Sequence, residues 1–489
     1  MKDLDIPSGR QFVDGVWTPA RAKGEIPVVD PALRRAFHTV AAAGAEDIDT
    51  AVTAARRAFP AWAATSPAER GVLLRRWADL IAAHIDALGA LEARDVGKPL
   101  SAGRTNGWIA HGIVEYVAGA ADKLTGVTLP VRGPDHFGYT RHEPWGVCAV
   151  VTPWNVPMVL TAANVAPALA VGNTVVLKVS EVAPLAPFAL AELADRAGFP
   201  PGVFNVLTGL GPLAGAALTG HRDVDHVSFV GSTDTGRAVM RSAAENLVPV
   251  KLELGGKSPN VVLADADLET AVPAIVASIT ENAGQNCYAG SRLLVEESVR
   301  AEVVERVVDG MRRVRTGSWD EDLDMGPLVS EAQCRRVRGF LDAVDGSARL
   351  LTGGGVPEGR SPHDWYVAPT VYDRVDPAAP LLRQEIFGPV LAVQGFRGMR
   401  EATRLMNDTD FGLLACVWTQ DVSRALRLAA EARTGQVSVN QFADSGVIGL
   451  PFNMQKNSGF SRGGGYASLR EYTQEKAVAV RLLDRPDAD

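Results

Sequence analysis

Residues 282–290 read NAGQNCYAG and place Cys287 between small and amide-bearing side chains. A cysteine thiolate is a strong nucleophile, but a free cysteine is more often a buried core residue than a catalytic one. The chain has four cysteines, and no two of them are close in sequence. This spacing argues against a disulfide framework or a CxxC metal site and fits a reducing compartment. The local sequence leaves both interpretations of Cys287 open.

Glu253 and Asn155 are two further residues whose types could assist such a nucleophile. Glu253 lies in the apolar segment KLEL, where a carboxylate is costly unless it is paired or used, so it is a salt-bridge partner or a general base. Asn155, in TPWNVP, either caps a helix or offers its side-chain NH₂ to an oxyanion. A Cys–His dyad has little support, because His226 and His363 belong to no recognisable motif.

The composition is that of a globular protein that works without nucleic acid or a membrane. A chain of 489 residues with 46% hydrophobic and 22% charged residues suggests about three globular domains. The formal charge of −8 argues against nucleic acid and anionic membranes as partners. The first ten residues contain acids where a signal peptide needs an apolar run, so we expect a cytoplasmic protein. Prolines, glycine and asparagines interrupt the apolar stretch 156–177, which predicts a buried helix, a turn and a strand.

The elements that must position these side chains are short β-branched strands alternating with apolar helices. The predicted strands are 147–151, 174–179, 203–207, 226–230 and 250–254, with helices at 185–198 and 233–246. A capping box, SPAE at 66–69, begins a long helix upstream. A second alternating region begins after residue 255 and ends near residue 440. This alternation predicts an α/β fold with parallel sheets that are covered on both faces.

The polar residues follow the carboxyl ends of these strands, where parallel sheets bind ligands. Asn155 follows the first strand, and Lys178 and Glu181 lie at the end of the second. The segment GSTDTGR follows the strand 226–230, and its Gly231 and Gly236 allow a backbone to approach a phosphate where a helix begins. This segment is neither a Walker A loop nor a GxGxxG motif, and alone it is more often a turn. If each of these residues had only a structural role, their occurrence in order at successive strand ends would be left largely unexplained.

Together the motifs resemble the aldehyde dehydrogenase superfamily, NAD(P)-dependent enzymes that oxidise aldehydes to acids. The matching segments, in the family's order, are TPWNVP, ALAVGNTVVLKVSEVAP, FVGSTDTG, LELGGKSPNVV, GQNCYAG, EIFGPV, NDTDFGL and PFNMQKNSG. The resemblance implies that Cys287 attacks the aldehyde, and that Asn155 and the Cys287 N–H stabilise the oxyanion. It implies that Glu253 activates the water that hydrolyses the thioester. No metal is expected.

The resemblance also implies NAD as the cofactor. Lys178 and Glu181 would bind the adenosine ribose, residues 231–236 would lie against the pyrophosphate, and Glu385 and Phe387 would lie near the nicotinamide ribose. Further contacts are implied for Thr152, Trp154, Gly211, Ser232 and Leu254. We expect NAD to be preferred to NADP, because Glu181 would repel a 2′-phosphate.

Three parts are implied for the fold. They are a Rossmann-like NAD-binding domain (1–125 and 145–255), a catalytic α/β domain (256–450) and a small β oligomerisation arm (126–144 and 470–489). The arm combines a predicted hairpin around residues 133–135 with the alternating tail 475–483, which has no partner nearby in sequence. Pairing with another subunit's sheet edge would give a homodimer or homotetramer.

The sequence departs from the family pattern at three places. Asn453 and Met454 replace the usual glycine pair, and Gly463 stands where a glutamate is common, which puts in doubt any second carboxylate that assists Glu253. Asn164, after Ala163, stands where a lysine or arginine is common.

With Val156, Met158 and Tyr288 near the substrate, the predicted pocket is mostly apolar and uncharged. It suits an aliphatic, terpenoid or aromatic aldehyde better than an acidic semialdehyde. Two rival activities are a coenzyme-A-acylating aldehyde dehydrogenase, against which Glu253 argues, and a cofactor-independent thiol esterase. A non-enzymatic role would leave the nucleophile, the base and the cofactor residues without a purpose.

Overall fold

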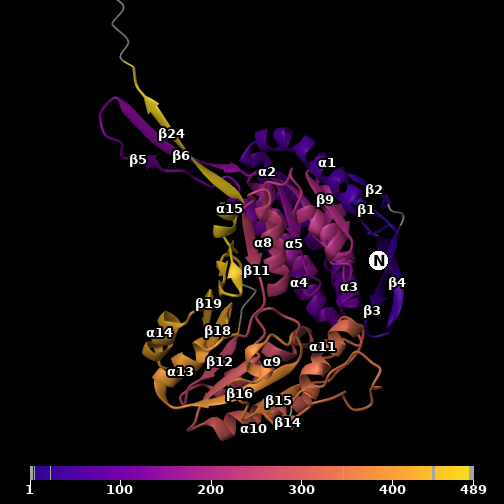
Figure 1. The fold of residues 1–489 in the computed structure, drawn as a ribbon, viewed down its shortest axis with the longest axis vertical. Coiled ribbons are helices and arrows are strands. Elements are labelled where there is room, and N and C mark those ends of the chain that lie inside the picture. Colours follow the sequence, from indigo (N-terminus) through magenta and orange to yellow (C-terminus); the bar gives the residue numbers. More distant parts are fainter. Residues whose placement is uncertain (1–3, 5, 22–23, 345, 443–446, 484–489) are drawn as a thin grey trace, which may run out of the picture.

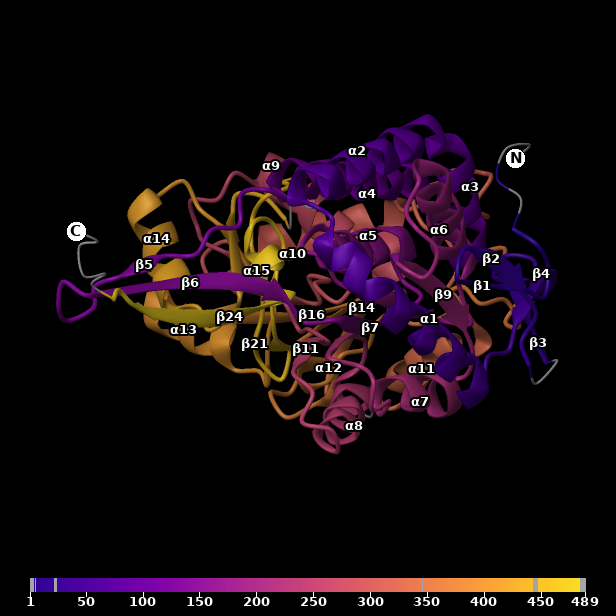
Figure 2. The ribbon, with the colours of Figure 1, turned by 90° about the horizontal axis from the view of Figure 1, so that it is seen from above.

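The computed structural model describes residues 4, 6–21, 24–344, 346–442 and 447–483. Small parts of the three predicted domains, including residues 484–489 of the arm, therefore lie outside the described residues. The described chain forms two large sheets with helices packed around them, and a thin β arm projects from this body (Figures 1 and 2). The predicted α/β fold class is confirmed.

The first sheet has eight strands in the order β2-β1-β9-β8-β7-β10-β11-β22. Their bounds are β1 Gln11–Val13, β2 Val16–Thr18, β7 Val147–Val151, β8 Thr174–Val179, β9 Phe204–Thr208, β10 His226–Val230, β11 Val250–Glu253 and β22 Gly459–Phe460. The five strands from β9 to β11 are parallel to one another. β1 and β22 pair antiparallel with the two outer strands of this group, and β2 pairs antiparallel with β1.

Two of the five predicted strands in this sheet differ from the prediction: β9 is shifted by one residue at both ends, and β11 ends one residue early. β9 begins one residue late, because the Val203 N–H is used in a turn hydrogen bond to Pro200 O (3.1 Å). β11 ends at Glu253, since the next N–H, that of Leu254, bonds to Ser458 O (2.9 Å). The other three strands lie where the sequence predicts them.

Helices cover both faces of this sheet, as the alternating pattern predicts. Alternate residues of β7 enter different cores: Cys148 and Val150 pack with α5 (Pro157–Ala170) and α6 (Leu185–Ala197), whereas Val147 and Ala149 pack with α1 (Ala45–Ala64). The second core also contains side chains of α7 (Ala216–Thr219), which follows the π-helix η1 (Gly211–Gly215), and of α8 (Thr233–Ala244).

Three further helices lie outside α5 and α6: α2 (Pro67–Ala83), α3 (Ile85–Val96) and α4 (Leu100–Ala120). The predicted capping box begins α2, where Ser66 Oγ accepts from the Glu69 N–H and the Glu69 carboxylate accepts from the Ser66 N–H. The apolar stretch 156–177 is α5, a turn and the start of β8, as predicted. Within the described residues, no helix is both long and apolar enough to cross a membrane.

The second sheet has seven strands in the order β14-β15-β16-β13-β12-β18-β19, and only β14 is antiparallel to its neighbour. The bounds are β12 Pro259–Val262, β13 Arg292–Glu296, β14 Arg349–Thr352, β15 Thr370–Asp373, β16 Val390–Phe396, β18 Leu414–Trp418 and β19 Gln436–Val439. Its helices are α9 Leu268–Thr280, the 3₁₀ turn η2 Glu281–Gly284, α10 Arg300–Arg313, α11 Glu331–Asp342, α12 Pro380–Arg383, α13 Gly398–Asn407 and α14 Val422–Glu431.

The projecting arm contains β5 (Thr128–Leu129), β6 (His136–Pro144) and β24 (Thr473–Arg481). β5 and β6 form the predicted hairpin, and β24 pairs antiparallel with β6 along all nine residues. The tail strand therefore has an intrachain partner, and it begins two residues before the predicted 475.

Smaller pairs complete the fold. They are β3 (Glu25–Asp30) with β4 (Arg35–Ala41), β17 (Phe411–Gly412) with β21 (Gln455–Lys456), and β20 (Phe452–Asn453) with β23 (Arg462–Gly463), followed by α15 (Ala467–Glu471).

Candidate active site

The candidate site lies at the point where the strand order of the first sheet reverses. From β7 the chain adds β8 and β9 on one side, and it then returns to add β10 and β11 on the other side. Ligands of open parallel sheets bind beyond the carboxyl ends of the strands at such a switch point. Asn155 follows β7, and Glu253 is the last residue of β11.

Cys287 is presented by a strained turn after α9. Asn282 and Ala283 have φ values of 52° and 54°, a left-handed conformation that is costly for residues other than glycine, and Gly284 continues it at 71°. The backbone of the glycine pair after β11 lies against this segment: a Cβ on Gly256 would lie 2.1 Å from Cys287 O. A glycine is therefore needed for the close approach that brings the second sheet's nucleophile to the first sheet's glutamate.

The structure brings Cys287 and Glu253 together. The Cys287 Sγ donates to Glu253 Oε1 at 4.0 Å. Burial, followed by the Glu253 and Glu385 carboxylates, raises the pKa of the Cys287 thiol well above its usual range. Burial likewise raises the pKa of Glu253, while the Lys251 ammonium lowers it. A carboxylate with a raised pKa is a better base near neutral pH.

Asn155 lies beside the nucleophile segment and is not a helix cap. Val156 occupies the N-cap position of α5 and makes no side-chain cap hydrogen bond, so that interpretation of Asn155 is wrong. The Asn155 Nδ2 donates to Gln285 O at 3.0 Å, two residues before Cys287. Its NH₂ group has a second hydrogen, which is available to an oxyanion near the cysteine.

A buried ion pair that the sequence analysis missed holds Asn155 in place. Lys98 Nζ donates to Glu92 Oε1 (2.8 Å) and to Asn155 O (2.9 Å), and both side chains of the pair are almost fully buried. The other Glu92 oxygen accepts from the Met158 N–H at 2.9 Å, at the start of α5. Asn282 Nδ2 also donates to Asn155 O, at 3.0 Å. The segment LEARDVGKPL gives no signal of this burial, because four of its ten residues are charged.

Glu385 borders the same glycine pair, and Trp154 contacts Phe387. Glu385 Oε1 accepts from the Gly256 N–H at 2.9 Å, and burial raises the pKa of Glu385 to about 7. The rings of Trp154 and Phe387 meet edge to face, with centroids 5.4 Å apart. Of these three predicted cofactor residues, Glu385 therefore lies against the glycine pair that contacts the Cys287 segment, and Trp154 and Phe387 lie against each other.

Lys178 and Glu181 form an ion pair at the end of β8. Lys178 Nζ lies 3.2 Å from Glu181 Oε2, and the lysine side chain is buried whereas 28% of the glutamate side chain is exposed. Burial lowers the pKa of Lys178, and Glu181 raises it. Thr152 lies at the neighbouring end of β7, and its buried Oγ1 has no hydrogen-bond partner within the described residues. A paired cation and anion beside an unused hydroxyl fit the hydroxyl groups of a ribose.

The start of α8 provides the predicted pyrophosphate surface. Ser232 caps α8, its Oγ accepts from the Thr235 N–H, and Gly231 precedes it. A Cβ on Gly236 would lie 2.6 Å from the Leu254 side chain, so this glycine packs the helix closely against the end of β11. Gly211 begins η1 beyond β9, where a Cβ would meet nothing within 4 Å. A capped helix N-terminus that packs this closely on the sheet fits the phosphates of a dinucleotide.

Met158, which the sequence analysis placed near the substrate, and Asn164, which stands where a basic residue is common, are both fully buried. Met158 is fully buried in the core that includes α5, and Asn164 is fully buried under β10 and β11. Asn164 Oδ1 accepts hydrogen bonds from Ser228 Oγ (3.0 Å) and Lys251 Nζ (2.7 Å). Tyr288 is partly exposed, and its ring lies 5.9 Å from that of Phe442.

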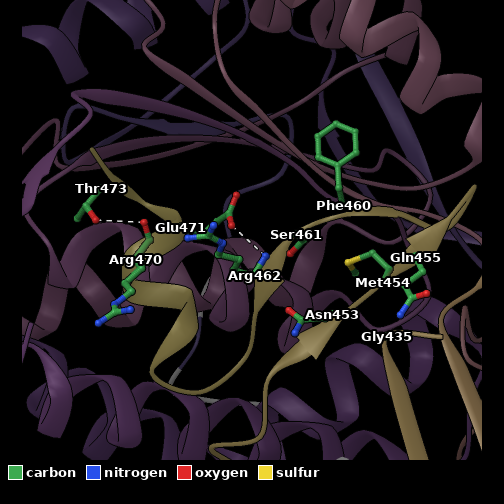
Figure 3. Close-up of a pocket in the computed structure, with 10 residues that line it drawn as sticks. All are labelled: Gly435, Asn453, Met454, Gln455, Phe460, Ser461, Arg462, Arg470, Glu471 and Thr473. Carbon is green, nitrogen blue, oxygen red and sulfur yellow. Dashed lines mark hydrogen bonds between the residues drawn. The ribbon is translucent and has the colours of Figure 1, made fainter. Parts of the chain in front are cut away.

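An open cavity of about 660 Å³ lies elsewhere, between β20–β23 and α15, and none of the predicted catalytic residues lines it (Figure 3). Asn453, Met454 and Glu471 are among its lining residues. Within the described residues, no cluster of three or more His, Cys, Asp or Glu side chains could hold a metal ion.

Comparisons with known proteins agree with this geometry. The mitochondrial aldehyde dehydrogenase of Equus caballus is 41% identical over 486 residues, covering 96% of this chain and 95% of the relative. The crystal structure of a putative aldehyde dehydrogenase from Burkholderia cenocepacia superposes with a TM-score of 0.95 at 44% identity, covering 97% of this chain and all of that one. A betaine aldehyde dehydrogenase of Staphylococcus aureus in complex with NAD⁺ does so with a TM-score of 0.95 at 34% identity, covering 99% and 96%. The profile of the Aldehyde dehydrogenase family matches residues 17–478, and the chain therefore belongs to this family.

Proposed function

We propose that the protein oxidises an uncharged aldehyde to the carboxylic acid with NAD, through a covalent intermediate on Cys287. The observation that carries the proposal is the meeting of three groups from distant parts of the chain: the Cys287 thiol, the Glu253 carboxylate at 4.0 Å and the Asn155 amide beside the nucleophile segment.

The first step makes a carbon–sulfur bond. Cys287 loses its proton to solvent and attacks the aldehyde carbon as a thiolate, and the carbonyl π electrons move to the oxygen. The Cys287 N–H and the free N–H of Asn155 stabilise that oxyanion. The Lys98–Glu92 pair fixes the Asn155 backbone, so that the amide does not have to reorganise as the charge develops.

The second step yields a thioester and then the acid. Bound NAD supplies the hydride acceptor. When the oxyanion collapses and its carbon loses hydride, the carbon stays attached to Cys287 as a thioester. Glu253 then takes a proton from water while the water oxygen attacks the thioester carbon, the carbon–sulfur bond breaks, and Cys287 leaves as a thiolate.

The cofactor assignment rests on this chain's own residues as well as on the family. The Lys178–Glu181 pair and Thr152 would hold the adenosine ribose, the start of α8 and Gly211 the pyrophosphate, and Glu385 with Trp154 and Phe387 the nicotinamide end. Solved NAD⁺ complexes of betaine aldehyde dehydrogenase, at 34% identity, support NAD.

The substrate class remains an uncharged aliphatic, terpenoid or aromatic aldehyde. Tyr288 follows the nucleophile, and its contact with Phe442 supplies aromatic surface near the reacting sulfur. Val156 follows Asn155 and adds an aliphatic side chain to the same segment.

The predicted division into NAD-binding, catalytic and arm segments, the homodimeric or homotetrameric state, and the cytoplasmic location remain proposals. The arm supports oligomerisation, because it projects from the body and exposes apolar side chains, among them Phe137 and Leu482.

The test is NADH absorbance in wild type and Cys287→Ser with hexanal and benzaldehyde. We expect oxidation by the wild type only, with unchanged NAD binding by fluorescence, because nucleophile loss normally costs several orders of magnitude in rate. More than about a hundredth of the wild-type rate in the variant would contradict the assignment. NAD-independent hydrolysis alone would favour the thiol esterase, and a need for coenzyme A would favour the acylating enzyme.

A further inference from the structure

Lys251 is a buried cation that none of the proposed steps uses. It lies in β11 two residues before Glu253, and only 2% of its surface is exposed. Because side chains of a strand alternate between the two faces, Lys251 and Glu253 point to the same face. A buried ammonium is costly unless partners hold it, so its place behind the proposed base requires an explanation.

An amide oxygen from α5 anchors this ammonium. Lys251 Nζ donates to Asn164 Oδ1 at 2.7 Å. The same oxygen accepts from Ser228 Oγ at 3.0 Å and from Tyr472 Oη at 3.1 Å. The Asn164 Nδ2 donates to Leu160 O at 2.8 Å, which fixes the amide with its oxygen toward the three donors. The position of the cation is therefore defined by a fully buried hydrogen-bonded cluster.

The charges around Lys251 make it the cation that acts on Glu253. Burial lowers the pKa of Lys251, and the Glu253 and Glu471 carboxylates partly offset this effect by raising it. In turn, the Lys251 ammonium lowers the pKa of Glu253, which burial raises. His226, on β10, stays neutral because burial and the Lys251 charge lower its pKa to about 3.

Two further titratable groups face the pair. Burial raises the pKa of the Tyr472 phenol, which follows α15, and of the Cys287 thiol, so that both are neutral near pH 7.

This arrangement accounts for two departures from the family pattern. Asn164 occupies the α5 position at which a basic residue is common, and Lys251 brings a cation to that amide from the neighbouring strand. Gly463 lacks the common glutamate, and a Cβ there would lie only 2.8 Å from Phe452 O. Glu471 instead supplies a carboxylate that raises the pKa of Lys251. This carboxylate also accepts from the Arg462 N–H, and Glu471 lines the open cavity (Figure 3).

We propose that Lys251 is a positioning residue for the general base: anchored on Asn164, its ammonium keeps the Glu253 carboxylate ionised while Glu253 awaits the hydrolytic water. This inference rests on the proposed role of Glu253 in thioester hydrolysis. When Glu253 accepts the proton, Asn164 Oδ1 still accepts from Lys251 Nζ, and the Glu471 carboxylate still raises the pKa of Lys251.

The test measures how fast the acyl group leaves Cys287 as a function of pH. The enzyme is acylated with benzaldehyde and NAD, quenched at intervals, and followed by intact-mass spectrometry from pH 5.5 to 9. The acid limb is the part of this profile in which the rate of acyl loss falls as the pH is lowered. In Lys251→Gln, which keeps a hydrogen-bond donor but loses the charge, we expect the acid limb to move to higher pH by about one unit. Acyl loss on that limb should be about tenfold slower than in the wild type. Lys251→Arg, which keeps the charge, should stay close to wild type.

Ser228→Ala is the matched control, because it removes a hydrogen bond to Asn164 without removing a charge. It should leave the acid limb in place, and the NADH burst should persist in all variants. Lys251→Met supplies a second neutral variant if the glutamine variant does not fold. An unmoved acid limb in the neutral variants, or an equal shift in Ser228→Ala, would overturn the inference. A normal decay in Glu253→Gln would instead overturn the proposed role of Glu253.

Discussion

The Cys287 Sγ lies 4.0 Å from Glu253 Oε1, so the proposed nucleophile and the proposed base share one electrostatic environment. Burial and the nearby carboxylates favour the neutral thiol over the thiolate. The structure therefore indicates that the thiol of the cofactor-free protein is mostly protonated near neutral pH. The thiolate that does form has a high pKa, and its intrinsic nucleophilicity is correspondingly high.

Alkylation of Cys287 by iodoacetamide should therefore be slow at pH 7 and rise steeply above the usual thiol range. Glu253→Gln removes a negative charge beside the sulfur, so its alkylation profile should move to lower pH. Peptide mass mapping separates Cys287 from the buried Cys148, Cys334 and Cys416. Slower alkylation of the variant at neutral pH would mean that Glu253 also removes the thiol proton.

Affinity for NAD should depend on the protonation of Glu385. Burial raises its pKa to about 7, so the carboxyl is neutral below that pH and ionised above it. The ionised form accepts charge-assisted hydrogen bonds from the ribose hydroxyls, which are stronger than those to the neutral carboxyl, so affinity should rise with pH between about 6 and 8. Fluorescence titration of the wild type and of Glu385→Gln measures this. The variant should bind NAD more weakly and with little pH dependence. If NAD affinity depended on pH as strongly in the variant as in the wild type, Glu385 would not be the group whose ionisation matters.

NAD should be preferred to NADP because Glu181 carries its charge at the adenosine end of the site. A 2′-phosphate beside this partly buried carboxylate would cost on the order of 1–4 kcal/mol, or roughly tenfold to several hundredfold in affinity. The ion pair with Lys178 restrains the rotation of Glu181 away from the site. Glu181→Ala should narrow the ratio of kcat/KM for the two cofactors. Equal kcat/KM values for NAD and NADP in the wild type would show that Glu181 does not determine the choice of cofactor.

The buried Lys98–Glu92 pair should contribute strongly to stability, in contrast to the exposed pair between Asp86 on α3 and Arg104 on α4. Lys98→Met leaves Glu92 buried without its cation, which should reduce the free energy of unfolding by about 3–5 kcal/mol. Arg104→Ala breaks the exposed pair with Asp86 (2.8 Å) and should cost about 0–1 kcal/mol. Urea unfolding measures the free energy of unfolding of both variants. Similar reductions in the two would contradict the prediction that the buried pair contributes more than the exposed one.

The sequence predicted what local pattern and motif order determine. The strands β7, β8 and β10 lie at their predicted residues, and the structure brings together Cys287, Glu253 and Asn155, which are far apart in the chain.

Residue patterns alone do not show which distant segments pair, and only the family resemblance placed the tail and the hairpin in one arm. The partner of the tail strand is β6, more than 300 residues upstream, and no local pattern links them. Lys251 was overlooked although it lies in the same KLEL segment as Glu253, where the argument from a buried charge applies equally. Asn164 was identified only as a departure from the family pattern, because helical position alone does not reveal that β10 and β11 cover its side chain.

The most direct test of the central claim is intact-mass spectrometry of Glu253→Gln after one mixing with benzaldehyde and NAD. The account predicts a full NADH burst and one benzoyl group on the Cys287 peptide, accumulating because its hydrolysis lacks a base. Cys287→Ser should show neither signal. Turnover without an acyl adduct, or an adduct on any residue other than Cys287, would contradict the covalent mechanism.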